Sequence, residues 1–234
     1  MGTAAVGYEP DMGLVSLAAR GAAATGGQAL RAATSTLAAA RPADKPLHPR
    51  GSVVPGVLER FGSLDTGASW LDEAGEDDVL VRQSRAVGLP AVAPDIFGLA
   101  VRVPLPDDRY GDLLFASTGL GRVSRFTLTA SRSPYRRPLT TLLPYRTPAG
   151  PVLLAAVHRD ERTIDLSCAV LTGDWKPFGV LRLESDGPTA ALDAPISFDP
   201  LLNTLPGLEN YGWVRRLREP SYFTARRSRR QGDR

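Results

Sequence analysis

The sequence Val79-Leu-Val-Arg-Gln-Ser-Arg-Ala-Val-Gly88, followed by Phe97-Gly-Leu-Ala-Val-Arg-Val-Pro-Leu105, decides the fold class. Both stretches are short apolar runs separated by turn-forming residues, which is the pattern of β-strands. Further runs of the same kind predict six more strands, at Gly51 to Phe61, Asp112 to Thr118, Leu139 to Tyr145, Pro151 to His158, Arg162 to Leu171 and Gly179 to Leu183. The acidic stretch Asp72 to Asp78 is predicted to be a loop, and no strand is expected after Pro200.

Eight short strands without alternating helical patterns favour an antiparallel sheet or barrel. Eight strands can close a barrel around side chains or one small ligand. The N-terminal part is different, because Met12 to Ala40 is alanine-rich and predicts one or two helices, broken near Gly26-Gly27. The predicted fold is therefore α+β, mainly β, with a helical arm at 1–42 and an eight-stranded barrel domain with a C-terminal helix at 43–234.

Composition narrows the functional classes. The 234 residues are 43% hydrophobic, which suits one large domain with appendages. The single cysteine excludes an internal disulfide framework, and the N-terminus lacks the basic region of a secretory signal, so the cytoplasm is the expected compartment. The alanine-rich segment is interrupted by arginine and glycine, so it predicts no membrane span. A net charge of +3 gives no reason to expect a nucleic acid as partner.

The C-terminal segment combines one tyrosine with several arginines. Arg218, Tyr222 and Arg229 are spaced by four and seven residues, so they share one face if the segment is helical. Neighbouring guanidinium groups favour the tyrosinate form of a buried phenol, and tyrosinate is a ligand of haem iron. On these residues alone, a solvated basic tail is the default interpretation.

Several stretches of this sequence, in a fixed order, resemble the haem-catalase superfamily. The longest are His48-Pro-Arg-Gly51, Val81-Arg-Gln-Ser-Arg-Ala-Val-Gly88 and Asp95-Ile-Phe-Gly98-Leu-Ala-Val-Arg-Val103. Shorter matches follow in the same order: Asp112-Leu-Leu with Thr118, Phe198-Asp-Pro200, Pro206-Gly-Leu-Glu209, and Arg218-x-x-x-Tyr222 with Arg229 beyond it. The resemblance covers Lys45 to Arg230. Because the chain is much shorter than a full catalase, it resembles the minimal, catalase-related haem peroxidases.

This resemblance implies haem b as cofactor, held between the barrel and the C-terminal helix. It implies that Tyr222 is the axial iron ligand and that Arg218 stabilises its anion. Arg82, Arg229 and Lys45 are the implied partners of the haem propionates, although lysine is a poorer bidentate partner than the arginine that the family carries there. Pro220 predicts that the C-terminal helix begins at that residue, which would leave Arg218 just outside it.

On the opposite side of the haem, the resemblance implies that His48 moves the peroxide proton and that Ser84 orients His48. Full catalases place an asparagine where this chain has Ala116, and Ser117 is the residue that could partly replace its hydrogen bond. Arg82 and Ser84 share one face of a strand. A haem in the barrel lumen would account for that polar face, and a polar stripe on a half-buried sheet is the alternative.

The expected activity is therefore reduction of organic or lipid hydroperoxides by a haem peroxidase with weak catalase activity and an unidentified reductant. Two alternatives stay open: a fatty-acid hydroperoxide isomerase of the same fold, and a haem-free barrel that serves as a binding module. The N-terminal arm is compatible with a homodimer or homotetramer. His158 and Cys168 lie outside the motifs and are expected to be structural.

Overall fold

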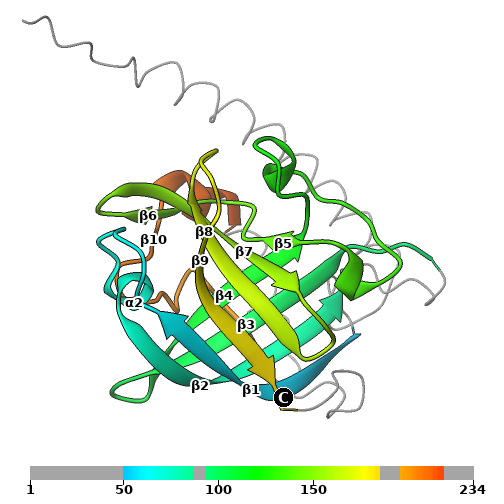
Figure 1. Ribbon diagram of the computed structural model, residues 1–234, viewed down its shortest axis with the longest axis horizontal. Helices are drawn as coiled ribbons and strands as arrows, with labels where there is room; N and C mark the ends of the chain where they lie inside the picture. The colour runs from blue at the N-terminus through cyan, green and yellow to red at the C-terminus, as the bar shows by residue number, and fades with distance from the viewer. Residues whose placement is uncertain (1–49, 87–92, 185–195, 219–234) are drawn as a thin grey trace, which may run out of the picture.

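The computed structural model describes residues 50–86, 93–184 and 196–218. Eight antiparallel strands close into a barrel in the order β7-β5-β4-β3-β2-β1-β9-β8, and pairing of β8 with β7 completes the ring (Figure 1). Their bounds are β1 Arg50–Phe61, β2 Ala74–Arg85, β3 Phe97–Leu105, β4 Arg109–Ser117, β5 Leu139–Thr140, β7 Gly150–His158, β8 Thr163–Val170 and β9 Lys176–Leu183. The predicted mainly-β fold with an eight-stranded barrel is confirmed.

Three details of the strand prediction are wrong. Residues 74–78 belong to β2 rather than to a loop, because the hairpin with β1 continues to the pair Phe61↔Ala74. Asp77 is accommodated there by Arg60, whose Nε lies 2.8 Å from its carboxylate. The segment from 139 to 145 is interrupted at Leu142, where φ is +62°, so β6 (Tyr145–Thr147) is a separate strand. Finally, β10 (Glu209–Asn210) follows Pro200 and pairs with β6.

The barrel interior is a packed apolar core. Side chains alternate between the two faces of a strand. The inward face of β1 to β4 supplies apolar residues that are at most a few per cent exposed. They are Val54, Leu58, Val79, Val81, Leu99, Val101, Val103, Leu113 and Phe115. Arg82 and Ser84 stand at the intervening positions of β2 and so face outward. The interpretation that haem occupies the lumen is therefore wrong, because side chains fill that space.

The short helix α2 (Ser69–Asp72) closes one end of the barrel (Figure 1). Its Trp70 and Leu71 are buried, and the Trp70 ring meets Phe178 of β9 edge-on at a centroid distance of 6.0 Å. The sequence pattern gave no indication of this helix. Four residues are too few for a helical period, and burial of the two apolar side chains stabilises the turn instead.

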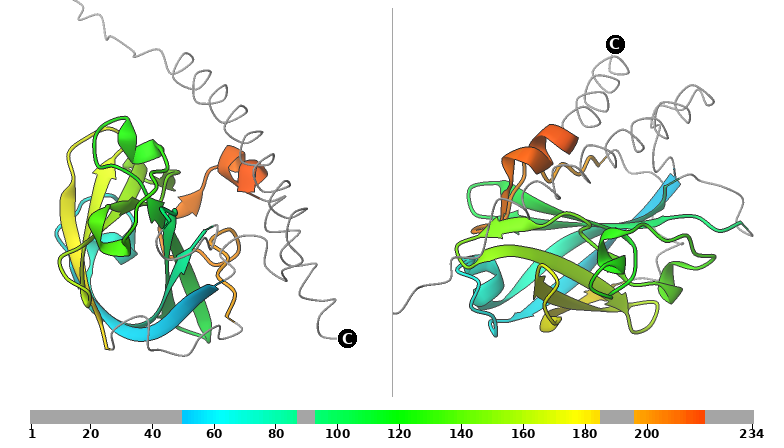
Figure 2. Two further views of the ribbon diagram at one scale, coloured as in Figure 1. Left: turned by 90° about the vertical axis from the view of Figure 1, so that its right-hand side faces the viewer. Right: turned by 90° about the horizontal axis from the view of Figure 1, so that it is seen from above.

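An outer strap, residues 196–210, crosses the outside of β3 and β4 and then reaches the barrel end closed by α2, where Leu205 and Leu208 join the core (Figure 2). Its anchor is Asp112, whose buried carboxylate accepts hydrogen bonds from Asp199 N and Asn203 Nδ2, both at 2.7 Å. Arg102 completes the network through Nε and Nη2, at 2.8 and 2.9 Å from the same carboxylate. The strap leads directly into a helical segment, residues 212–218.

Among the described residues, no helix has the length and apolar character needed to cross a membrane.

Candidate functional site

The outward face of β1 to β4 carries a row of small residues. The strand registers pair Gly51 with Ser84, Ser84 with Gly98, and Gly98 with Ala116, so these four residues lie side by side across four strands. Three of the four lack a side chain beyond Cβ. The end of the row at Gly98 and Ala116 is therefore flat enough for a planar ligand to approach the backbone closely.

The neighbouring row on the same face holds Arg82 between apolar residues. Val53 pairs with Arg82, Arg82 with Ala100, and Ala100 with Leu114. The Arg82 side chain lies over the first row, because a Cβ built on Gly51 would stand 2.7 Å from Arg82 Cζ and 2.8 Å from Nη2. Arg82 is only 9% exposed, so its guanidinium group is largely buried on this face.

Ser84 contributes a half-buried hydroxyl at the centre of the small-residue row. Its Oγ lies 3.5 Å from the carbonyl oxygen of Gly98, at the long limit of a hydrogen bond. A serine hydroxyl can rotate, so it can accept or donate in more than one direction.

Ser117 lies on the other face of β4, away from this row. Its hydroxyl accepts a hydrogen bond from Phe97 N at 3.1 Å and donates one to Thr129 O at 2.7 Å, and the residue is 1% exposed. Both bonds tie β4 to neighbouring backbone, so the structure does not bring Ser117 together with Arg82 and Ser84. The residue of β4 that lies in the small-residue row is Ala116.

Arg218 lies within a helix. Residues 212–218 are helical, Arg215 N donates to Tyr211 O at 3.0 Å, and Val214 is 1% exposed. The expectation that Arg218 lies just outside a helix is therefore wrong, because burial of Val214 already orders this turn, and the expected helix start at Pro220 lies outside the described residues. Arg218 Nη2 donates to Thr141 O at 3.2 Å, one residue before the φ-positive Leu142.

The remaining candidate residues, Lys45, His48, Tyr222 and Arg229, lie outside the described residues. Within the described ranges, no group of three or more histidine, cysteine, aspartate or glutamate residues is placed to hold a metal ion.

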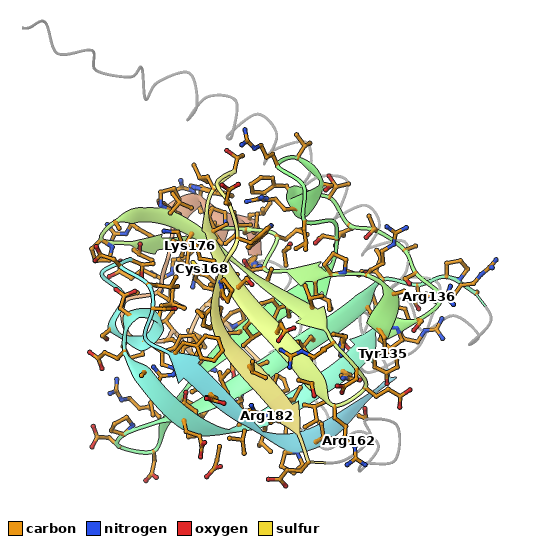
Figure 3. All side chains as sticks on the ribbon, in the orientation of Figure 1. Tyr135, Arg136, Arg162, Cys168, Lys176 and Arg182 are labelled. Carbon is orange, nitrogen blue, oxygen red and sulfur yellow. The ribbon has the colours of Figure 1, made fainter. Side chains whose placement is uncertain are left out.

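Two other reactive residue types take structural positions. Cys168 belongs to the core on β8, where it pairs with Lys176 of β9 (Figure 3). Burial raises the pKa of its thiol to about 12, so the sulfur stays protonated and unreactive. His158 meets the Tyr135 ring edge-on at 5.0 Å, and burial lowers the pKa of its imidazole.

Asp112 and Phe198-Asp-Pro200 belong to two motifs that nothing in the sequence links to each other. The structure joins them, since Asp199 N donates to Asp112 across 87 positions of sequence. Asp112 follows the β4 glycine, and Asp199 precedes a proline. Neither the glycine nor the proline indicates which distant residue the aspartate beside it contacts, so the contact is seen only in the folded chain.

Solved structures of catalases resemble this chain. A bacterial catalase superposes with a TM-score of 0.54 at 13% identity, over 78% of this chain and 56% of that one. A fungal catalase gives 0.55 at 12% identity, over 79% and 58%. Catalase A from Saccharomyces cerevisiae gives 0.51 at 11% identity, over 79% and 60%. This chain thus spans less than two thirds of the length of these catalases, and the likeness establishes a catalase-like fold.

No protein-family model matches the chain. No curated protein matches its sequence.

Proposed function

We propose that this protein binds haem b against the outward face of β1 to β4 and reduces organic or lipid hydroperoxides with it. The proposal is supported by the catalase-like fold and by the residues of that face. The observation that carries it furthest is the position of Ala116, in one row with Gly51, Ser84 and Gly98.

The described residues fit a haem group. A porphyrin needs a flat, mostly apolar surface and cations near its two carboxylates. The small-residue row and the apolar Val53 and Ala100 supply such a surface, and Arg82 supplies a cation that is already held in place over it. A guanidinium in that setting suits a carboxylate partner, because it offers two parallel donors.

The remaining contacts are assigned to Arg218 and to residues beyond the described ranges. In this proposal Tyr222 is the iron ligand, Arg218 supports its anionic form, and Lys45 and Arg229 approach the propionates. Arg218 belongs to a helix that follows the strap on the outside of the barrel, which is the side that the proposal requires. Bound haem would supply the redox chemistry that cleaves the O–O bond of the peroxide.

The protein residues would manage protons and position the substrate. His48 would take the proton from one peroxide oxygen and return it to the other, as a group with a near-neutral pKa can. Ser84 would orient the His48 ring. Reduction of a hydroperoxide ROOH to the alcohol ROH and water also takes up two electrons and two protons, so an external donor must supply both electrons.

Ala116 favours a peroxidase over a catalase. A catalase must hold a second, small hydrogen peroxide molecule in place, and a side-chain amide achieves this by hydrogen bonding. The alanine methyl group offers no hydrogen bond and leaves room for the alkyl part of a larger hydroperoxide.

The test compares wild type with Ala116→Asn in parallel assays of oxygen evolution from hydrogen peroxide and of dye oxidation by a fatty-acid hydroperoxide. Wild type should favour dye oxidation, and the variant should shift the ratio towards oxygen by roughly tenfold, the effect of about one hydrogen bond. Ala74→Asn, an exposed position at the start of β2, is the matched control and should leave the ratio unchanged.

Three results would contradict the proposal. Vigorous oxygen evolution by wild type would indicate a catalase. Conversion of the fatty-acid hydroperoxide to an isomer without consumption of the donor would indicate an isomerase. A protein that takes up no haem would indicate a binding module.

A further inference from the structure

One end of the molecule presents a cluster of exposed apolar side chains outside the proposed haem face. We define this apolar tip as residues 120–128, between β4 and β5, together with residues 170–176 of the β8–β9 hairpin (Figures 1 and 2). Of the eight large apolar residues exposed within the described ranges, four lie in it: Val123 at 79%, Val170 at 52%, Phe126 at 38% and Leu128 at 36%. Such clustering on one small area distinguishes the tip from apolar residues scattered singly over a surface.

A buried arginine holds the tip in one conformation. Arg125 is 3% exposed and donates hydrogen bonds to four backbone carbonyls, two within its own loop and two in the β8–β9 hairpin: those of Leu120, Gly121, Leu171 and Gly173, at 2.8 to 3.1 Å. Its guanidinium also lies 4.4 Å from the centre of the Trp175 ring, and Trp175 Nε1 donates to Leu120 O at 2.9 Å. The exposed apolar groups are therefore displayed by a rigid support rather than by a loose loop.

Two of these groups stand side by side. Val123 directly precedes the 3-10 helix η1 (Ser124–Phe126), and Phe126 N donates to Val123 O at 3.1 Å. Residues three apart in such a turn lie one above the other. Val123 and Phe126 consequently form one outward-facing apolar edge.

The tip also carries excess positive charge. The hydrogen-bond acceptors of Arg125 are all neutral carbonyls, and exposed Arg122 stands next to Val123. The pKa of Arg125 is lowered by burial and then by the nearby Arg122 charge, while Asp174 acts in the opposite direction. With Lys176, the tip holds three cationic residues and one anionic residue.

We propose that the apolar tip docks the protein reversibly on anionic lipid membranes, with Val123 and Phe126 entering the boundary between headgroups and acyl chains. Arg122 then faces the lipid phosphates. Apolar insertion combined with attraction to anionic lipid is how peripheral proteins bind a bilayer surface. This docking is independent of haem binding.

A protein partner fits the tip less well. A stable protein interface uses about 20–30 residues from each side, whereas the tip offers four exposed apolar side chains on a small projecting area. A fluid lipid surface adapts to a small projection without needing a complementary shape. The net positive charge also favours anionic lipid over a second copy of this positively charged chain.

The experiment is flotation of the full-length protein with vesicles of phosphatidylcholine, alone or mixed with phosphatidylserine. Wild type should bind the mixed vesicles better, and added salt should weaken that binding. Val123→Ser combined with Phe126→Ser should reduce binding at least about tenfold, because two apolar side chains no longer insert. Arg122→Gln should reduce it by roughly fivefold and only on the mixed vesicles, the effect of about one juxtamembrane cation.

Matched controls separate the tip from general surface effects. Leu202→Ser removes another exposed apolar side chain, 64% exposed on the outer strap. Arg136→Gln removes another exposed arginine, whose side chain lies away from the tip (Figure 3). Both should bind like wild type. The basic C-terminal segment is present in every variant, so it cannot account for differences among them.

The proposal is overturned if wild type does not float with either vesicle, or if the tip variants bind as wild type does. It is also overturned if sedimentation without lipid shows self-association that the double variant abolishes, since the tip would then be a protein interface. Circular dichroism checks that each variant is folded. If the double variant is not, Val123→Ser alone decides, because that side chain is largely in solvent.

Discussion

The guanidinium of Arg82 lies so close to Gly51 that a Cβ on Gly51 would stand 2.7 Å from Arg82 Cζ. The two residues are on adjacent strands, and the absence of a side chain at Gly51 is what lets the arginine lie flat along the outward face of β1 and β2. On the proposed site, this contact sets the position of the cation that would receive a haem carboxylate.

Gly51→Ala should therefore lower both stability and haem retention. The added methyl group meets the Arg82 guanidinium and, also at 2.7 Å, the backbone carbonyl of Gln83, so one of them must move. Overpacking of this kind costs about 1–3 kcal/mol of unfolding free energy. Urea unfolding measures it. Gly212→Ala is the matched control, since a Cβ there meets nothing within 4 Å; equal stability of the two variants would contradict the assigned contact.

Asp112→Asn should detach the outer strap from the barrel. The Asp112 carboxylate is fully buried and is bound by Arg102, Asp199 N and Asn203, so neutralising it leaves the Arg102 charge without its counter-ion. Breaking one partner of a buried ion pair costs about 3–5 kcal/mol. Glu209→Gln, in the exposed pair with Arg146, should cost no more than about 1 kcal/mol. If Asp112→Asn unfolded at the same urea concentration as wild type, the hydrogen-bond network around Asp112 would not be what holds the strap.

His158 should make the folded protein sensitive to acid. Burial lowers the pKa of its imidazole below the ordinary 6.5, so the unfolded chain takes up a proton at a higher pH than the folded chain does. Above pH 6.5 the imidazole is neutral in both states, so it does not change the free energy of unfolding. That free energy falls as the pH drops below 6.5 through the folded pKa, because the unfolded chain binds the proton first. His158→Gln should flatten the decline of unfolding free energy over this range. A slope equal to that of wild type would contradict the prediction.

Periodicity predicted most of the barrel because a closed sheet buries one face of every strand. Phe97 to Leu105 shows this best: the predicted and observed bounds of β3 agree, since its apolar positions alternate between a packed interior and an outer face. The acidic start of β2 does not have the pattern of a strand, because the residue that stabilises it there is distant in the chain. Asp77 is acceptable in a strand only through its ion pair with Arg60 of β1.

The sequence also does not determine whether a polar residue of a strand faces the barrel lumen or the outer surface. Arg82 and Ser84 could be placed on one face from their spacing, but the choice between lumen and outer surface depends on what fills the barrel. The core contributed by the neighbouring strands decides it. Likewise, nothing in the local sequence indicates that Ser117 uses its hydroxyl to bind the backbone of Phe97 and Thr129, whereas Ala116 takes the outward position.

The most direct test of the central claim is titration of the purified, haem-free protein with hemin, followed by its absorption spectrum. Wild type is expected to bind hemin with a sharp Soret band and a ferric spectrum typical of tyrosinate ligation. Tyr222→Phe should lose that binding or change the ligation, while Tyr135→Phe should behave as wild type. Failure of the wild-type protein to bind hemin, or an unchanged spectrum in Tyr222→Phe, would contradict the account.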